Sequence, residues 1–142
     1  MMKISIGNDH AGYIRKNVLL EYLKKEGHNI KNYGTDTVTS VDYPDFVHPV
    51  AKDIIEGNAE FGILLCGSGN GVAITANKYK EVRAALCWNK ELANLARAHN
   101  NANILCIPSR FITEENLLDI VESFLKTPFE GGRHQRRVDK IC

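Results

Sequence analysis

One stretch near the middle of the chain, residues 61–71, constrains the fold most. Its first half, Phe61–Cys66, is an apolar run of strand length, typical of a strand that is covered on both faces of a parallel sheet. Three glycines follow within five residues, and Val72–Asn77 can then begin a helix. A strand, a glycine turn and a helix in this order direct backbone N–H groups toward one anion. We therefore expect an α/β fold with an anion-binding turn.

The turn, residues 67–71, has a plain interpretation and a functional one. Its sequence, Gly-Ser-Gly-Asn-Gly, matches neither of the common nucleotide-binding fingerprints, so it could be a simple connecting loop. Cys66 could be a small core residue, because free cysteine is among the most buried residue types. Alternatively, Cys66 and Ser68 place reactive groups beside bound or developing negative charge.

The apolar pattern of the whole chain predicts a single domain, residues 1–142. Strand-like runs alternate with helical patterns, which indicates a three-layer α/β/α Rossmann-like sandwich around a five-stranded parallel sheet. Beyond Pro128, a C-terminal arm of residues 128–142 carries a short basic helix that could reach a neighbouring subunit. We expect strands at 3–6, 28–33, 61–66, 82–87 and 103–107, and helices at 14–26, 44–56, 72–77, 90–98, 114–126 and 131–140.

Composition and charge argue against several classes of protein. A formal charge of +1 gives no reason to expect a nucleic-acid or membrane partner. The chain enters a strand at once and has no apolar run of about 20 residues, so we expect neither a signal peptide nor a membrane span. No Asp, Glu or His cluster shows metal spacing, so we expect no metal and no cofactor. The scattered cysteines, Cys66, Cys87, Cys106 and Cys142, indicate a reducing cytoplasm.

Polar residues follow three of the expected strands, at the edge where parallel sheets bind ligands. Asp9 and His10 follow the first strand, Cys66 and Ser68 the third, and Arg110 the fifth. We expect these segments to converge. Asp9 could instead only cap the next helix, as aspartate in a turn often does.

Three further residues also have two interpretations. His99 ends a helix, where a histidine is favoured by the helix dipole, but it could also exchange protons near neutral pH. Arg133 and Arg137 are four residues apart and so share one helix face. They could be solvated, or they could hold a phosphate dianion, in which case a site completed by a neighbouring subunit would depend on a dimer.

Taken together, these residues resemble the type B ribose-5-phosphate isomerase family, which also includes galactose-6-phosphate and allose-6-phosphate isomerases. The resemblance runs nearly end to end. It rests on the Asp-His pair after the first strand, on Tyr43-Pro-Asp45, on Cys66 with the glycine turn, on His99-Asn100, on Pro108-Ser-Arg110, and on the spaced Arg133 and Arg137.

The resemblance implies a cofactor-free enzyme that interconverts D-ribose 5-phosphate and D-ribulose 5-phosphate through a cis-enediolate. Cys66 would be the base and His99 would assist ring opening, with Asp9 near the sugar and Ser68 relaying protons. The family also implies a homodimer or dimer of dimers with shared sites. Substrate would be bound by Asp9, His10, Tyr43, Gly67, Ser68, Gly69, Asn70, Gly71, Asn100, Arg110, Arg133 and Arg137.

Two departures from the family pattern bear on this assignment. One branch uses a glutamate after the last glycine of the turn as its base, but here that position is Val72, which indicates the cysteine branch. Ser68 stands where relatives of this branch often have threonine, which leaves the substrate range open. A six-carbon sugar phosphate is the alternative substrate, and a non-enzymatic phosphate-binding module of flavodoxin-like build is the alternative function.

Overall fold

A computed structural model describes all 142 residues and confirms the predicted α/β/α sandwich. Its five strands are all parallel and lie in the order β2-β1-β3-β5-β4. The strands are β1 (Lys3–Asn8), β2 (Asn29–Asn32), β3 (Phe61–Cys66), β4 (Ala84–Leu86) and β5 (Ile104–Pro108).

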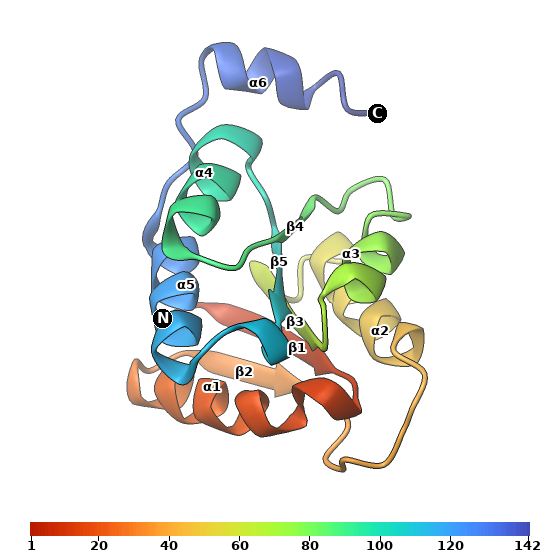
Figure 1. The fold of residues 1–142 in the computed structure, drawn as a ribbon. Coiled ribbons are helices and arrows are strands. Elements are labelled where there is room, and N and C mark those ends of the chain that lie inside the picture. Colours follow the sequence, from red (N-terminus) through yellow and green to blue (C-terminus); the bar gives the residue numbers. More distant parts are fainter.

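Helices cover both faces of the sheet (Figure 1). The helices are α1 (Tyr13–Lys25), α2 (Pro44–Ile55), α3 (Asn70–Ala76), α4 (Lys90–Asn100), α5 (Glu114–Lys126) and α6 (Arg133–Val138). One core cluster joins the sheet to α1, α4 and α5, and the other joins it to α2 and α3. Side chains of β3 alternate between the two, with Ile63 and Leu65 in the first and Leu64 and Cys66 in the second.

Local sequence explains most of the element boundaries. Thr113 caps α5 through a capping box with Asn116, and Pro44 occupies the first turn of α2. The expected fourth strand is shorter than predicted, because only Ala84–Leu86 pairs with β5. The C-terminal helix is also shorter than predicted, since Gly131 and Gly132 have positive φ angles and remain outside it. No helix is both long and apolar enough to cross a membrane.

Because all five strands are parallel, their N-terminal ends lie at one edge of the sheet and their C-terminal ends at the other. Every strand finishes at one edge of the sheet, whereas α4 runs back toward the opposite edge before β5 begins. The arm of residues 128–142 lies at that opposite end, where α6 packs beside the last turn of α4 (Figure 1).

Candidate active site

The three segments predicted to converge do so, because β1, β3 and β5 are adjacent in the sheet. The amide of Asp9 donates to the carbonyl of Leu65 at 3.3 Å, which joins the end of β1 to the end of β3. The amide of Arg110 donates to the carbonyl of Gly67 at 3.1 Å, which joins the end of β5 to the glycine turn. The backbone therefore holds Asp9, Cys66 and Arg110 at one edge.

Asp9 caps the turn that follows it, as the sequence suggested, and it also contacts Cys66. One carboxylate oxygen, Oδ1, accepts hydrogen bonds from the amides of Ala11 and Gly12 at 3.0 and 3.2 Å, and so caps the short 3₁₀ turn before α1. The other, Oδ2, accepts from the thiol of Cys66 at 3.5 Å. Because Asp9 and Cys66 are both buried, this acid–thiol contact is largely shielded from water.

The environment of Cys66 favours the neutral thiol in the single chain. Burial raises the pKa of this thiol most, and the negative charge of Asp9 raises it further. The amides of Gly69 and Gly67 lower the same pKa, as expected of the glycine turn, but by less. In the chain alone, burial and Asp9 therefore outweigh the amides of the glycine turn.

The glycine turn is shaped by close neighbours. Gly69 has φ +80°, and a side chain there would also meet the Leu86 Cδ1 at 2.4 Å, so only glycine fits without strain. Gly71 lies against the ring of Tyr43, whose carbons would be 2.6 Å from an added Cβ. The Ser68 hydroxyl accepts a hydrogen bond from the amide of Asn70 at 3.2 Å.

His10 and Arg110 also belong to this edge. The Nδ1 atom of His10 accepts from the amide of Val41 at 3.2 Å, which leaves its proton on Nε2 when the ring is neutral. The exposed Arg110 reaches back over the turn, because its Nη1 atom would lie 3.3 Å from a Cβ on Gly67. We call the edge of the sheet at which the strands end the carboxyl edge. It brings together Asp9, His10, Tyr43, Cys66, Gly67, Ser68, Gly69, Asn70, Gly71 and Arg110.

The remaining predicted residues lie at the other end of the sheet. His99 and Asn100 finish α4, and Arg133 and Arg137 belong to α6 beside it. Along β3 and β5 the register runs from Gly62 opposite Ile104 to Cys66 opposite Pro108. Those four residue steps span about 13 Å, and His99 precedes β5 altogether. One chain therefore does not bring these four residues to Cys66.

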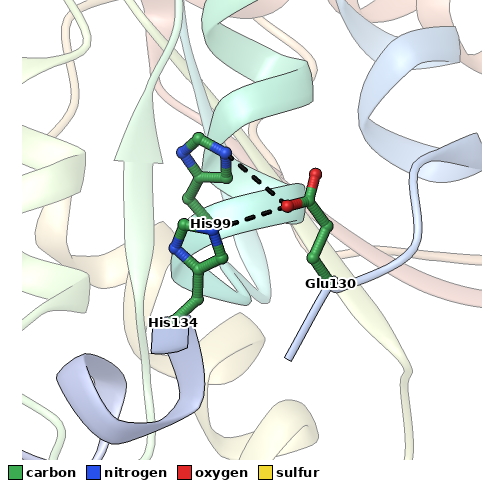
Figure 2. A group of neighbouring side chains, drawn as sticks. All are labelled: His99, Glu130 and His134. Atoms are coloured by element: carbon green, nitrogen blue, oxygen red, sulfur yellow. Dashed lines mark ion pairs between the residues drawn. The ribbon is translucent and has the colours of Figure 1, made fainter. Parts of the chain in front are cut away.

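Two residues that the sequence did not single out, Glu130 and His134, surround His99 (Figure 2). The imidazole rings of His99 and His134 stack with centroids 4.1 Å apart, at an angle of 11°. Their Nε2 atoms lie 3.9 and 3.4 Å from the same Oε1 atom of Glu130. Burial is the main cause that lowers the pKa of His134, and the neighbouring His99 lowers this pKa further. This cluster was not predicted, because the four-residue spacing of Glu130 and His134 is its only signal in the sequence.

Comparisons with known proteins bear on the whole chain. Residues 4–141 match the model of a family described as Ribose/Galactose Isomerase. A probable ribose-5-phosphate isomerase B of Mycoplasma genitalium is 48% identical over 97% of this chain and 92% of its own length.

Two solved structures are also similar. A ribose 5-phosphate isomerase of Thermotoga maritima has a TM-score of 0.97 at 49% identity, covering 99% of this chain and 97% of its own. The Mycoplasma genitalium ribose-5-phosphate isomerase B with bound ribulose-5-phosphate has a TM-score of 0.93 at 47% identity, covering 98% and 93%.

Proposed function

Because this chain belongs to the ribose/galactose isomerase family and is an isomerase, we propose that it interconverts D-ribose 5-phosphate and D-ribulose 5-phosphate. The observation that carries the proposal is the contact of the Cys66 thiol with Asp9 beside the glycine turn. A similar protein from Mycoplasma genitalium binds ribulose-5-phosphate, which supports a pentose as substrate. A six-carbon sugar phosphate remains the alternative, since the family name includes galactose.

The proposed reaction moves one proton between C1 and C2 of the open-chain sugar. Cys66, as its thiolate, removes the proton from one carbon and returns it to the other, through a cis-enediolate. The Oδ2 atom of Asp9 is 3.5 Å from the sulfur and can receive the thiol proton before this step. The reaction needs no change in the oxidation state of any protein group.

The glycine turn would stabilise the negative oxygen of the enediolate. Backbone amides between Gly67 and Gly71 act as fixed donors, and loss of one such donor typically costs about 3 kcal/mol of transition-state stabilisation. Ser68 would exchange protons with the sugar hydroxyls. Tyr43, which packs on Gly71, would line the pocket and set its width.

A second copy of the chain would complete the site. His99 would assist ring opening by proton transfer, and Asn100 would bind the sugar. Arg133 and Arg137 would bind the phosphate together with His10 and Arg110 of the first chain. The support for this arrangement is the opposite placement of the two groups along the sheet, which prevents one chain from supplying both. The proposal therefore requires a homodimer or a dimer of dimers.

A panel of aldose phosphates tests the proposal. Wild-type protein is assayed with ribose, allose and galactose phosphates in the presence of a chelator, and Cys66→Ala is assayed beside it. We expect turnover of ribose 5-phosphate with chelator present, and no turnover by Cys66→Ala although it still binds the sugar phosphate in calorimetry. Near-normal turnover by Cys66→Ala would refute the base assignment, and preference for a six-carbon substrate would replace the pentose.

A further inference from the structure

Three potential metal ligands meet at the end of α4, and we call them the histidine–glutamate cluster (Figure 2). His99 comes from the last turn of α4, Glu130 from the segment after α5, and His134 from α6. Two imidazole nitrogens and one carboxylate oxygen, one from each residue, all lie within 4.8 Å of one another. The Nε2 atoms of both histidines lie within 4.0 Å of the same Oε1 atom of Glu130.

An unsatisfied nitrogen inside the cluster is an independent sign of a ligand. His134 is only 7% exposed, and its Nε2 atom is buried without a hydrogen-bond partner. Glu130 lies 3.4 Å away, but the pair is not aligned as a hydrogen bond. A buried polar atom without a partner is costly, typically by about 1–3 kcal/mol, and a cation at this position would remove that cost.

We propose that His99, Glu130 and His134 bind a divalent transition-metal ion of the zinc type. Two imidazoles with one carboxylate are a known zinc ligand set, and a water would complete the tetrahedron. With metal–ligand bonds of about 2.0–2.2 Å, neighbouring ligand atoms in a tetrahedron are about 3.3–3.5 Å apart. Glu130 and His134 already meet that spacing at 3.4 Å, whereas Glu130 and His99 must close by a few tenths of an ångström from 3.9 Å.

The stacked rings must open for the ion to bind. Parallel imidazoles cannot both direct their lone pairs at one ion, so one ring has to tilt away from the observed angle of 11°. His99 is the ring that can move, since its side chain is 39% exposed while that of His134 is 8% exposed. The buried His134 would act as the fixed ligand and His99 as the adjustable one.

The chemistry of the ligands selects the metal. Imidazole nitrogen suits zinc, cobalt, nickel and copper, whereas magnesium and calcium prefer sites made of oxygen alone. Arg133 and Arg137 on the same short helix carry positive charge and will weaken the affinity for any cation. We therefore expect reversible binding that responds to metal concentration rather than a permanently occupied site.

Binding would inhibit the enzyme, a consequence that rests on the proposed role of His99. An imidazole that ligates zinc cannot exchange protons, so ring opening would stop while the metal is bound. The chelator in the assay above would then maintain activity. Metal bound at the histidine–glutamate cluster would thus inhibit the enzyme. It would not be a cofactor, because the proposed isomerisation does not use the ion.

Calorimetry and cobalt spectroscopy test the site without measuring activity. Metal-free protein carrying Cys66→Ala and Cys142→Ser, which removes the reactive thiol and the exposed one, is titrated with Zn²⁺ and then with Co²⁺. We expect one ion per chain and visible cobalt absorption typical of tetrahedral coordination. In the same background, Glu130→Gln and His134→Asn should each weaken binding by more than about 100-fold, beyond the effect of losing an outer-shell partner.

A matched control is His28→Asn, which alters the histidine just before β2, an edge strand that two other strands separate from β5. It should bind zinc like its parent. Unchanged zinc affinity in Glu130→Gln would overturn the proposal, as would the absence of zinc binding by the parent that lacks both cysteines. Because Glu130 is exposed, Glu130→Gln decides the matter even if His134→Asn fails to fold.

An activity measurement separates this inference from the proposed function. Zinc should inhibit the wild-type enzyme, magnesium should not, and the inhibitory zinc concentration should rise at least tenfold in Glu130→Gln. If zinc binds at the cluster without inhibiting, the site stands and the assigned role of His99 fails. If zinc does not bind while isomerisation proceeds, the metal site fails and the proposed function stands.

Discussion

Two inactive variants of this protein should restore activity to each other when they are mixed. Cys66→Ala removes the proposed base at the carboxyl edge of the sheet, and His99→Asn removes the ring-opening group at the opposite end. About 13 Å of strand separates the two edges, since β3 and β5 pair over four residue steps between them. A pentose phosphate that contacts both groups must therefore lie between two copies of the chain.

The expected recovery follows from counting sites in a two-fold dimer. Random reassortment of equal amounts of the two variants gives about half mixed dimers. In each mixed dimer, one site receives the intact Cys66 of one chain and the intact His99 of the other, while the second site lacks both. About one quarter of all sites are then wild type, so about one quarter of wild-type turnover should return.

The assay uses differently tagged chains that are co-refolded, with the mixed dimer quantified by its two tags and ribose 5-phosphate turnover measured on the mixture. Cys66→Ala mixed with Asp9→Asn is the matched control. Those two residues share one edge of one chain, 3.5 Å apart, so no mixed dimer of that pair contains an intact site. Recovery in the control, or none in the test pair once mixed dimers are present, would refute the shared site.

Three other perturbations test individual parts of the site. His99→Asn should slow the reaction of cyclic substrate at least tenfold more than that of an open-chain analogue; equal losses would remove its ring-opening role. Asp9→Asn should lower the pKa of Cys66, because a negative charge 3.5 Å from the sulfur now raises it. The rate of Cys66 alkylation is proportional to the fraction of thiolate, so the midpoint of its pH dependence should move to lower pH. An unchanged midpoint would show that Asp9 is not the cause of the raised pKa. Gly71→Ala should push the half-exposed Tyr43 ring outward and raise KM several-fold, while the free energy of unfolding changes by less than about 1 kcal/mol; an unchanged KM would place Tyr43 outside the pocket.

The carboxyl edge of the site could be predicted from sequence because its determinants are local. The apolar run Phe61–Cys66 identified a doubly covered strand, and the glycines after it identified the turn. Once five parallel strands were expected, the residues after the first, third and fifth had to share one edge. Gly69 has a positive φ angle, a conformation that favours glycine, and this requirement of the turn explains the glycine at that position.

The sign of the Cys66 pKa shift could not be predicted because it depends on competing distances. The sequence indicated amides that would stabilise a thiolate, and the structure includes that effect. It did not indicate that the Oδ2 atom of Asp9 would lie 3.5 Å from the sulfur, or that the thiol would be buried. When contributions to a pKa oppose one another, tertiary geometry decides which of them prevails.

The histidine–glutamate cluster was missed for a different reason. Glu130 and His134 have the spacing of neighbours on a helix, yet no helix joins them. Gly131 and Gly132 adopt φ angles of +69° and +56° between them, and that turn returns His134 toward α4. A cluster that depends on a turn and on packing against a distant helix leaves no periodic pattern in the sequence.

The raised pKa of Cys66 and the divided site have a common explanation in our proposal. In one chain, the charged group in contact with the sulfur is the carboxylate of Asp9, which opposes formation of a thiolate. Two of the cationic groups proposed for the same site, Arg133 and Arg137, lie at the far end of the sheet. A second copy would bring its own arginines and His99 toward this sulfur, and positive charge lowers the pKa of a thiol. Assembly would thus supply both the phosphate-binding groups and the charge that a thiolate base requires, so the isolated chain is expected to hold Cys66 in its unreactive form.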